Sequence, residues 1–282
     1  MTSYGQRLTA ATKARGPLCV GVDPHPALLQ AWGLRNDVAG LERCARGLVD
    51  ALGALVPVFK PQSAFFEAHG SAGIAVLERT LTDIAATGAL SLLDVKRGDI
   101  GSTMDAYAAA YLTDGSPLAA DAITLSPYLG FGSLAGALDL AVDQGRGVYV
   151  LALTSNPEGP EFQQATTADG RTVGQAVVDA AAAYNRDAGV VDGGLGPVGI
   201  VVGATIGRTG TDFSALNGSI LAPGIGAQGG GAADLREVFG AAAAAVLPST
   251  SREVMGAGPD PAALQRAATR ALGEMKAVIG LG

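Results

Sequence analysis

Residues 90–98 read LSLLDVKRG, a short apolar run that ends in charged residues and a glycine. Seven other runs have the same form, and each closes on a polar or turn residue, a pattern typical of buried strands. Ala- and Leu-rich segments with helical spacing lie between and after the runs, so strands and helices are predicted to alternate. The other predicted strands cover 17–23, 56–60, 122–126, 147–154, 198–203, 219–223 and 243–249, and the predicted helices cover 38–53, 71–88, 103–113, 132–145, 173–188, 231–241 and 260–279, with a short piece near 211–217.

The order of these elements predicts an α/β fold. Near-continuous apolar strands joined by helices are typical of a parallel sheet that is covered on both faces. Eight such units in 282 residues favour a (β/α)8 TIM barrel, and a doubly wound open sheet is the alternative. No linker, charge block or shift of composition divides the sequence, so we expect a single barrel domain over residues 1–282.

The charge balance and the apolar runs exclude several classes of protein. The chain has 19 Lys and Arg against 26 Asp and Glu, a net charge of −7, and no basic run that could follow a phosphate backbone. Nucleic acid is therefore not an expected partner. The longest apolar run, 241–247, is far shorter than the roughly 20 residues of a membrane-spanning helix, and residues 1–16 lack the apolar region of a signal peptide. We expect no membrane partner and a cytoplasmic protein.

Cysteine and histidine are scarce. Two cysteines, Cys19 and Cys44, and two histidines, His25 and His69, are too few for a disulfide framework or a zinc cage. We interpret the cysteines as buried reduced thiols and the histidines as ordinary loop and helix-start residues. No metal site is predicted.

The densest group of charges lies where the predicted strand at residues 90–96 ends. Asp94 and Lys96 are two residues apart, so both side chains are expected on the same, inward face of the strand. Gly98 ends the strand and brings Asp99 close, and Lys60 closes the neighbouring strand. Charges removed from water cost several kcal/mol unless they are paired, so this group is either a structural ion-pair network or a site. Reactive groups of such barrels lie at the carboxyl ends of strands, and Lys60 there favours a site.

A glycine-rich turn, LAPGIGAQGGG at 221–231, follows the seventh predicted strand. The dinucleotide-binding interpretation of its G-x-G-x-x-G pattern is rejected because too few residues follow for the rest of that fold. Backbone N–H groups in such a turn attract phosphate, and the loops after strands seven and eight of a barrel are a recurring phosphate site. Arg252, after the eighth strand, is suited to the same anion. The alternatives are a tight packed turn and a solvated arginine.

Two further strand ends carry weaker signals. Asp23 could bind a sugar hydroxyl or could begin an Asx-type turn before Pro24. Ser155 could hydrogen-bond a ligand in the loop after the fifth strand. Residues 155–172 form a long polar loop of the kind that often acts as a lid.

Together these residues resemble a known enzyme family. The string DVKRGDIGST at 94–103, with Lys60 upstream and PGIGAQGG at 223–230 downstream, resembles the orotidine 5′-phosphate decarboxylases, in particular their longer bacterial (type 2) branch. The resemblance runs in order from Asp23 to Arg252 and so covers most of the chain. It implies a (β/α)8 homodimer that needs no cofactor or metal and makes UMP and CO2 in pyrimidine synthesis.

The resemblance also implies a role for each motif residue. Lys60, Asp94 and Lys96 would form the charged row of one subunit. Asp99 and Thr103 would reach into the site of the partner subunit. The nucleotide would be held by side chains and backbone of the remaining motif positions, with Asp23 on the ribose, Ser155 on the pyrimidine, and Gln228, Gly229 and Arg252 on the phosphate.

The chemistry of the implied reaction agrees with this arrangement. Loss of CO2 leaves a carbanion on the pyrimidine, and Lys96 could both stabilise it and protonate it, while Asp94 would lie near the departing carboxylate. Two other functions stay open. One is a magnesium-dependent sugar-phosphate decarboxylase or aldolase-like relative, which by the resemblance has an acidic ligand where Lys60 stands. The other is a non-catalytic phosphate-binding barrel.

Overall fold

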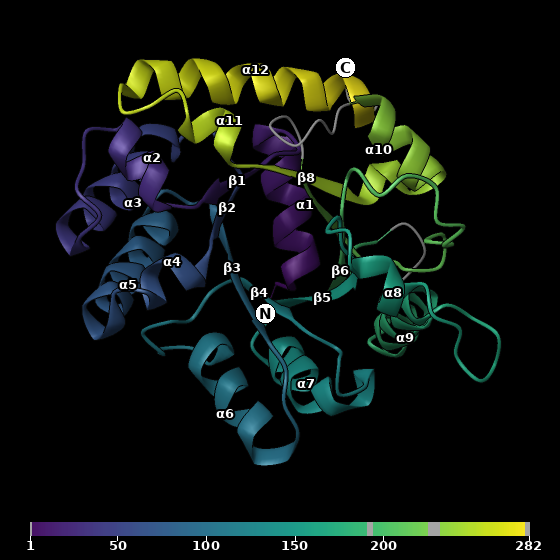
Figure 1. Cartoon of the computed structure of the whole chain (residues 1–282). Helices are drawn as coiled ribbons and strands as arrows, with labels where there is room; N and C mark the ends of the chain where they lie inside the picture. The colour runs from purple at the N-terminus through teal and green to yellow at the C-terminus, as the bar shows by residue number, and fades with distance from the viewer. Residues whose placement is uncertain (1, 191–193, 225–231, 280–282) are drawn as a thin grey trace.

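The computed structural model of this chain describes residues 2–190, 194–224 and 232–279. Eight parallel strands close into a barrel in sequence order, because β8 pairs with β1 (Figure 1). The strands are β1 (Cys19–Val22), β2 (Val58–Pro61), β3 (Leu90–Arg97), β4 (Ala122–Leu125), β5 (Gly147–Leu153), β6 (Val198–Val202), β7 (Ile220–Pro223) and β8 (Val246–Thr250). The predicted barrel is confirmed, and the open doubly wound sheet is wrong for this chain.

A ring of helices surrounds the barrel (Figure 1). The long ones are α3 (Val38–Leu52), α5 (Gly70–Ala86), α6 (Gly101–Leu112), α7 (Ala135–Asp143), α9 (Val173–Asp187), α10 (Ala232–Phe239) and α12 (Pro261–Ile279). Four shorter helices, which the sequence did not predict, are α2 (Pro26–Ala31), α4 (Ser63–Glu67), α8 (Gly159–Gln163) and α11 (Arg252–Met255). The 3₁₀ turn η1 (Phe131–Leu134) forms the start of the helix predicted at 132–145, and η2 (Gly240–Ala245) follows α10. His25 caps α2 through its Nδ1, which accepts the N–H of Leu28 at 3.3 Å, as expected of a helix-start residue.

Two predicted elements differ in the structure. Residues 211–217 form no helix, because Asp212 uses its carboxylate to accept the N–H of Ser214 at 2.9 Å, a local bond that competes with helical pairing. The eighth strand begins at Val246 and not at residue 243, since the alanines before it complete the 3₁₀ turn η2. Alanine favours helical conformations over extended ones.

Side chains alternate between two cores. Outward residues such as Leu93 pack against the helices in the larger core, whereas inward residues such as Leu92 belong to a smaller cluster that fills the barrel. That inner cluster also contains Cys19, which is buried and reduced as predicted, as is Cys44 under the helices. Polar side chains replace apolar ones on the inward face toward the carboxyl ends of the strands, where Lys60 and Asp94 lie. The barrel therefore has a dry interior and a polar mouth.

Helix α1 (Tyr4–Arg15), which the sequence did not predict, covers the opposite end of the barrel. It crosses the middle of the ring of helices in Figure 1. The Tyr4 ring enters the barrel, where its hydroxyl lies 3.1 Å from that of Tyr149. A Cβ at Gly147, the first residue of β5, would lie 2.4 Å from the Tyr4 ring, so only glycine leaves room for it. A capping box of Ser3 and Gln6 begins the helix.

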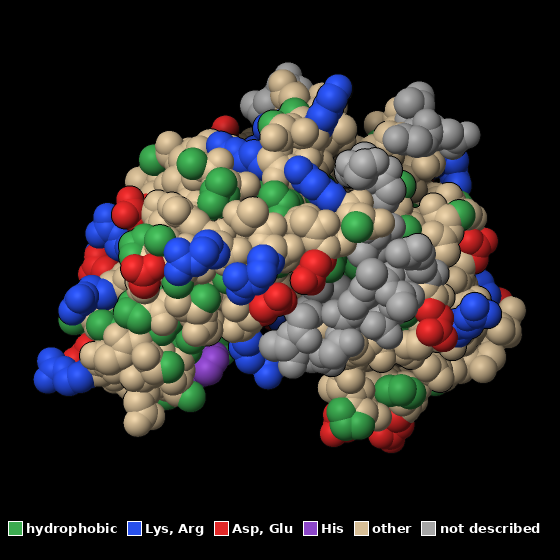
Figure 2. All heavy atoms as spheres, turned by 90° about the horizontal axis from the view of Figure 1, so that it is seen from above, with side chains coloured by type: hydrophobic (Ala, Val, Ile, Leu, Met, Phe, Trp, Pro, Cys, Tyr) green, Lys and Arg blue, Asp and Glu red, His purple; other side chains and the backbone are tan. Residues whose placement is uncertain are grey.

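The outer surface has a mixed charge. On the face over α12, shown in Figure 2, Lys and Arg side chains lie among Asp and Glu side chains. Of the helices in the described residues, none is both long enough and apolar enough to cross a membrane.

Candidate active site

Three of the predicted charged side chains meet at the polar mouth of the barrel. The Asp94 carboxylate lies between two ammonium groups, with Lys60 Nζ 3.3 Å from Oδ2 and Lys96 Nζ 2.6 Å from Oδ1. Lys60 and Asp94 are buried, whereas the Lys96 side chain is 46% exposed. The row therefore runs from the closed interior of the barrel to its open end, and Lys96 is the member that a ligand in the mouth would meet.

Burial and pairing act in opposite directions on these groups. Burial favours the neutral form of Asp94, but the charges of Lys60 and Lys96 outweigh it and hold the pKa of the carboxyl at about 2. Burial alone would also lower the pKa of Lys60, yet Asp94 and Asp23 raise it above its ordinary value. Both groups are therefore ionised at neutral pH. Below them, burial raises the pKa of the Cys19 thiol to about 12, so it adds no charge.

The backbone of β3 departs from a regular strand where it carries these residues. Leu93 pairs with Ile123 and Arg97 with Leu125, so residues 94–96 lie opposite the single residue Thr124. Lys96 has a φ of 44°, in the left-handed region that non-glycine residues seldom adopt. The predicted meeting of Asp94 and Lys96 is confirmed, but regular alternation along a strand is the wrong explanation. A bulge brings the two side chains together.

The structure adds Thr124 to the site, a residue that sequence reasoning missed. Its Oγ1 accepts the N–H of Val95 at 3.0 Å and of Lys96 at 2.9 Å, and donates to Asp94 Oδ1 at 2.8 Å. Gln62 was also missed, and its Nε2 donates to the carbonyl of Asp94 at 3.3 Å. The available signal for Thr124 was a polar residue two positions after Ala122, on the inward face of an otherwise apolar strand.

Asp99 and Thr103 do not join this row within one chain. Asp99 Oδ1 accepts the N–H of Ile100 at 2.8 Å, and within the described ranges no ion pair of Asp99 is formed. Thr103 is exposed on α6. Of the four charged residues grouped from the sequence, Lys60, Asp94 and Lys96 meet in the single chain and Asp99 does not. Gly98 behaves as predicted, since the strand ends at Arg97.

Asp23 follows β1 at the mouth of the barrel, and one of its carboxylate oxygens is available to a ligand. The N–H of His25 bonds to the backbone carbonyl of Asp23 at 2.8 Å, so the side chain does not form the Asx turn that was the alternative. Its Oδ1 is buried and has no hydrogen-bond partner among the described residues. A Cβ at Gly21 would lie 2.7 Å from Ser251 Cβ and 3.0 Å from Asp23 Oδ2, so that glycine lets Asp23 and Ser251 approach each other.

The remaining predicted contacts lie on the loops around the mouth. Ser155 is exposed after β5, and a Cβ at Gly203 would lie 3.0 Å from its backbone N, so glycine brings this loop against the end of β6. Arg252 is exposed at the start of α11, next to Ser251. Gln228 and Gly229 lie outside the described residues.

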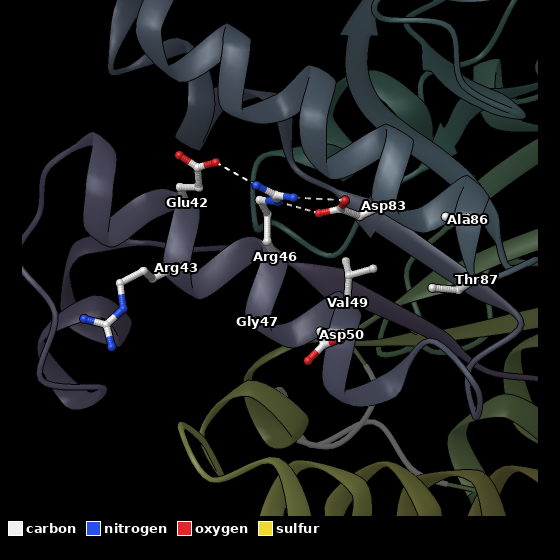
Figure 3. A pocket seen from close by; sticks show the side chains of 9 residues that line it. All are labelled: Glu42, Arg43, Arg46, Gly47, Val49, Asp50, Asp83, Ala86 and Thr87. Atoms are coloured by element: carbon white, nitrogen blue, oxygen red, sulfur yellow. Dashed lines mark hydrogen bonds and ion pairs between the residues drawn. The ribbon is translucent and has the colours of Figure 1, made fainter.

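A hollow on the outer surface is a different feature. It has a volume of about 610 Å³ and lies between α3 and α5 on the outside of the barrel. Arg46 there is held between Glu42 and Asp83, as Figure 3 shows, at 3.0 and 2.5 Å. None of its lining residues belongs to the charged row. Its charges largely neutralise one another, so we place the site at the barrel mouth.

Comparison with known proteins identifies the family of the chain. Residues 16–267 match the family described as orotidine 5′-phosphate decarboxylase / HUMPS. The chain belongs to this family. The orotidine 5′-phosphate decarboxylase of Salinispora arenicola is 60% identical over 99% of both chains, and that of Streptomyces coelicolor is 54% identical over 99% of both chains. The family, the fold and the enzyme class predicted from the motifs are confirmed.

Solved structures of this family show the same fold. A crystal structure from Streptomyces avermitilis is 54% identical and superimposes with a TM-score of 0.95, covering 99% of this chain and 97% of that one. OMP decarboxylase from Leishmania donovani is 29% identical with a TM-score of 0.76 over 99% of both chains. Orotidine 5′-phosphate decarboxylases thus share the barrel whose mouth carries Lys60, Asp94 and Lys96 here.

Proposed function

We propose that Lys96 stabilises and then protonates the ring carbanion when this chain converts orotidine 5′-phosphate to UMP and CO2, a step of pyrimidine synthesis. The bond from the ring carbon to the carboxylate breaks, CO2 leaves, and the electron pair stays on the ring carbon. A proton from the Lys96 ammonium then forms the new C–H bond, and solvent restores the proton to Lys96. The observation that carries the proposal is the ammonium at the open end of a buried, paired row.

The magnitudes favour stabilisation of the carbanion over repulsion of the substrate. Two like charges about 4 Å apart, as Asp94 and the substrate carboxylate would be, repel by about 4 kcal/mol at an effective dielectric near 20. Enzymes lower barriers by roughly 8–23 kcal/mol. Most of the effect must therefore come from the ammonium of Lys96, held in place before the reaction, and from binding of the distant phosphate.

The same row supports activity without a metal. Asp94 has both carboxylate oxygens occupied, by Lys60 on one side and by Lys96 and Thr124 on the other. Mg²⁺ needs free oxygen ligands, and two neighbouring ammonium groups repel it. Lys60 in this place therefore disfavours the magnesium-dependent relative, and the intact row disfavours a non-catalytic phosphate-binding barrel.

For the nucleotide itself, we propose the contacts that the motifs implied. Asp23 would bind the ribose, because its buried Oδ1 can accept from a hydroxyl. Ser155 would bind the pyrimidine, and Arg252, with Gln228 and Gly229, would bind the phosphate. Asp23 lies close to Ser251, the residue before Arg252. The proposed ribose contact therefore lies beside the proposed phosphate contact, as the two groups do in a nucleotide.

We further propose a homodimer in which Asp99 and Thr103 complete the partner's site. Asp99 is half-buried, has no ion pair among the described residues, and precedes Ile100, which is 63% exposed. The adjoining loop after β4 carries Tyr128 and Leu129, which are 72% and 50% exposed. Exposed apolar residues on two adjoining loops, one of which carries a carboxylate without an ion pair among the described residues, favour an interface with a second copy. The cytoplasmic location and the single domain over residues 1–282 stay predictions.

Lys96→Ala tests the proposed role of Lys96. We expect CO2 release, followed by ultraviolet absorbance of orotidine 5′-phosphate in EDTA, to fall by about 10⁴-fold or more, because both carbanion stabilisation and the proton donor are lost. UMP binding, measured by calorimetry, should stay detectable. Near wild-type turnover of Lys96→Ala would refute the role of Lys96, and loss of wild-type turnover in EDTA would refute metal independence.

A mixing experiment tests the shared site. Lys96→Ala and Asp99→Ala should each be inactive alone. Mixed in equal amounts and allowed to exchange subunits, they should recover about a quarter of wild-type activity, because half of the dimers then contain one intact site of two. No recovery, with exchange verified by a tagged subunit, would place Asp99 in its own chain's site.

A further inference from the structure

We propose that Thr124 is a positioning residue for the decarboxylation, because its hydroxyl holds the bulge of β3 in the shape that aims Lys96 at the barrel mouth. The inference rests on the proposed role of Lys96. Thr124 itself contacts Asp94 and the backbone of β3, and it acts on the reaction through them.

The hydrogen-bonding capacity of the Thr124 hydroxyl is fully used. A hydroxyl has one proton to donate and two lone pairs to accept with. Its proton goes to Asp94 Oδ1, and its lone pairs accept the N–H groups of Val95 and Lys96. Thr124 is 1% exposed, so water does not replace these bonds. One side chain therefore ties together the carboxylate and two consecutive amides.

The bulge needs such a partner. Three residues of β3 lie opposite one residue of β4, so the ladder between the two strands cannot pair the amides of Val95 and Lys96 with carbonyls in the usual register. Buried amides without partners are destabilising, and the hydroxyl supplies the missing acceptor. An isosteric valine would fill the same volume without accepting either bond.

The strain at Lys96 makes its placement depend on this support. A non-glycine residue with a φ of 44° is held there only where its surroundings fix it. The same residue carries the ammonium that is paired at 2.6 Å with Asp94. Without Thr124, the backbone can relax toward a regular strand and carry Lys96 Nζ away from its position. Misplacement of a catalytic group by about 1 Å can cost on the order of 100-fold in rate.

The test compares Thr124→Val, which removes the hydroxyl at constant shape, with Thr124→Ser, which keeps it. Thr80→Val is the matched control, since Thr80 is also fully buried and its hydroxyl donates to a backbone carbonyl at 2.8 Å, but on α5 away from the mouth. For each variant, kcat, KM and the Kd of UMP would be measured, with activity normalised to the number of UMP sites.

We expect kcat of Thr124→Val to fall by about 10- to 100-fold, with the Kd of UMP within about threefold of wild type, because the ammonium is misplaced while the nucleotide contacts stay. Thr124→Ser should recover kcat to within about threefold, and Thr80→Val should leave kcat unchanged. If Thr124→Val does not fold, Thr124→Ala replaces it and carries the same expectation.

Three results would overturn the proposal. They are a kcat of Thr124→Val within twofold of wild type, a Thr124→Ser enzyme as slow as the valine variant, and a loss of kcat in Thr80→Val equal to that in Thr124→Val. A failure of the proposed function is distinguishable from these, because Lys96→Ala would then keep its turnover.

Discussion

The two ends of the barrel are built from the same eight strands but from opposite kinds of side chain. At the amino end of the strands, the Tyr4 ring fits against Gly147, and its hydroxyl meets that of Tyr149. At the carboxyl end, Lys60 and Asp94 are buried as ions, and Lys96 stays half exposed. A helix closes the amino end over an aromatic pair, with the ion pair of Arg7 and Asp121 beside it, while the carboxyl end holds a buried row of charges that opens to the mouth.

The difference teaches which end stabilises the fold and which end performs chemistry. Burying an aromatic ring is favourable in itself, whereas a buried ion pair offsets a large desolvation cost and adds little net stability. The charges at the mouth are therefore explained by their action on a ligand, and the buried Tyr4 ring by its contribution to the stability of the barrel. Substitutions at the two ends should accordingly separate stability from turnover.

Among the substitutions that compare the two ends, the largest loss of stability and turnover together is expected for Asp94→Asn. Lys60 is left buried and unpaired, so the free energy of unfolding should fall by about 3–5 kcal/mol. Turnover should fall by at least about 100-fold as well, because Lys96 loses the carboxylate that orients it. Urea titration and the absorbance assay measure the two effects.

Asp83→Asn is the control for that substitution. Asp83 pairs with Arg46 on the outer surface, where both side chains are 30% or more exposed. A partly exposed pair contributes about 1 kcal/mol or less, so this variant should keep both its stability and its turnover. An equal loss of stability in the two variants would contradict the contrast drawn between a buried and a surface carboxylate.

Tyr4→Ala should destabilise the closed end without affecting the open one. Loss of a fully buried ring costs about 3–5 kcal/mol, which lowers Tm by about 10 °C in a chain of this size. The kcat of the folded variant should match wild type. Tyr4→Phe removes only the hydroxyl pair and should cost about 1 kcal/mol. A drop in kcat for Tyr4→Ala at 10 °C, well below its Tm, would show that the two ends are coupled.

Acid should selectively reduce the stability that the Asp94 ion pairs give to the open end of the barrel. Asp94 has a pKa of about 2 in the folded chain, below its value in the unfolded chain. Its contribution to the free energy of unfolding is therefore present at pH 5 and is lost as the pH falls toward 2. The contribution is on the order of 2 kcal/mol. The stability gap between wild type and Asp94→Asn should therefore be constant from pH 5 to 7 and should narrow below pH 4. A gap that widens on acidification would contradict the assignment of a lowered pKa.

The smallest effect is expected for Arg252→Ala. Loss of a charge-assisted phosphate contact should raise KM and lower kcat/KM by about tenfold, with no change in stability because Arg252 is exposed. Arg270→Ala, an exposed arginine on α12, is the control and should leave kcat/KM unchanged. Equal kcat/KM values for Arg252→Ala and wild type would remove Arg252 from the site.

Much of the fold and part of the site could be predicted because both follow from local patterns. The eight apolar runs mark strands that are buried on both faces, and their polar ends mark the mouth, so Lys60, Asp94 and Lys96 were found from position alone. Helix α1 was missed because its first turns are polar on most sides and only Tyr4, Gly5 and Leu8 are buried. Its place depends on Gly147, which leaves room for the Tyr4 ring and is distant in sequence.

The sequence by itself determined the alternation of strands and helices and the residue types at the strand ends, since periodicity and chain order need no knowledge of distant contacts. The pairing of β8 with β1, which closes the barrel and excludes the open sheet, came from the tertiary structure. Only the tertiary structure decided that Lys96 adopts a φ of 44° and that the Thr124 hydroxyl accepts its N–H. The physical reason is that register between neighbouring strands sets these positions, and a bulge changes that register without changing the local pattern of residues.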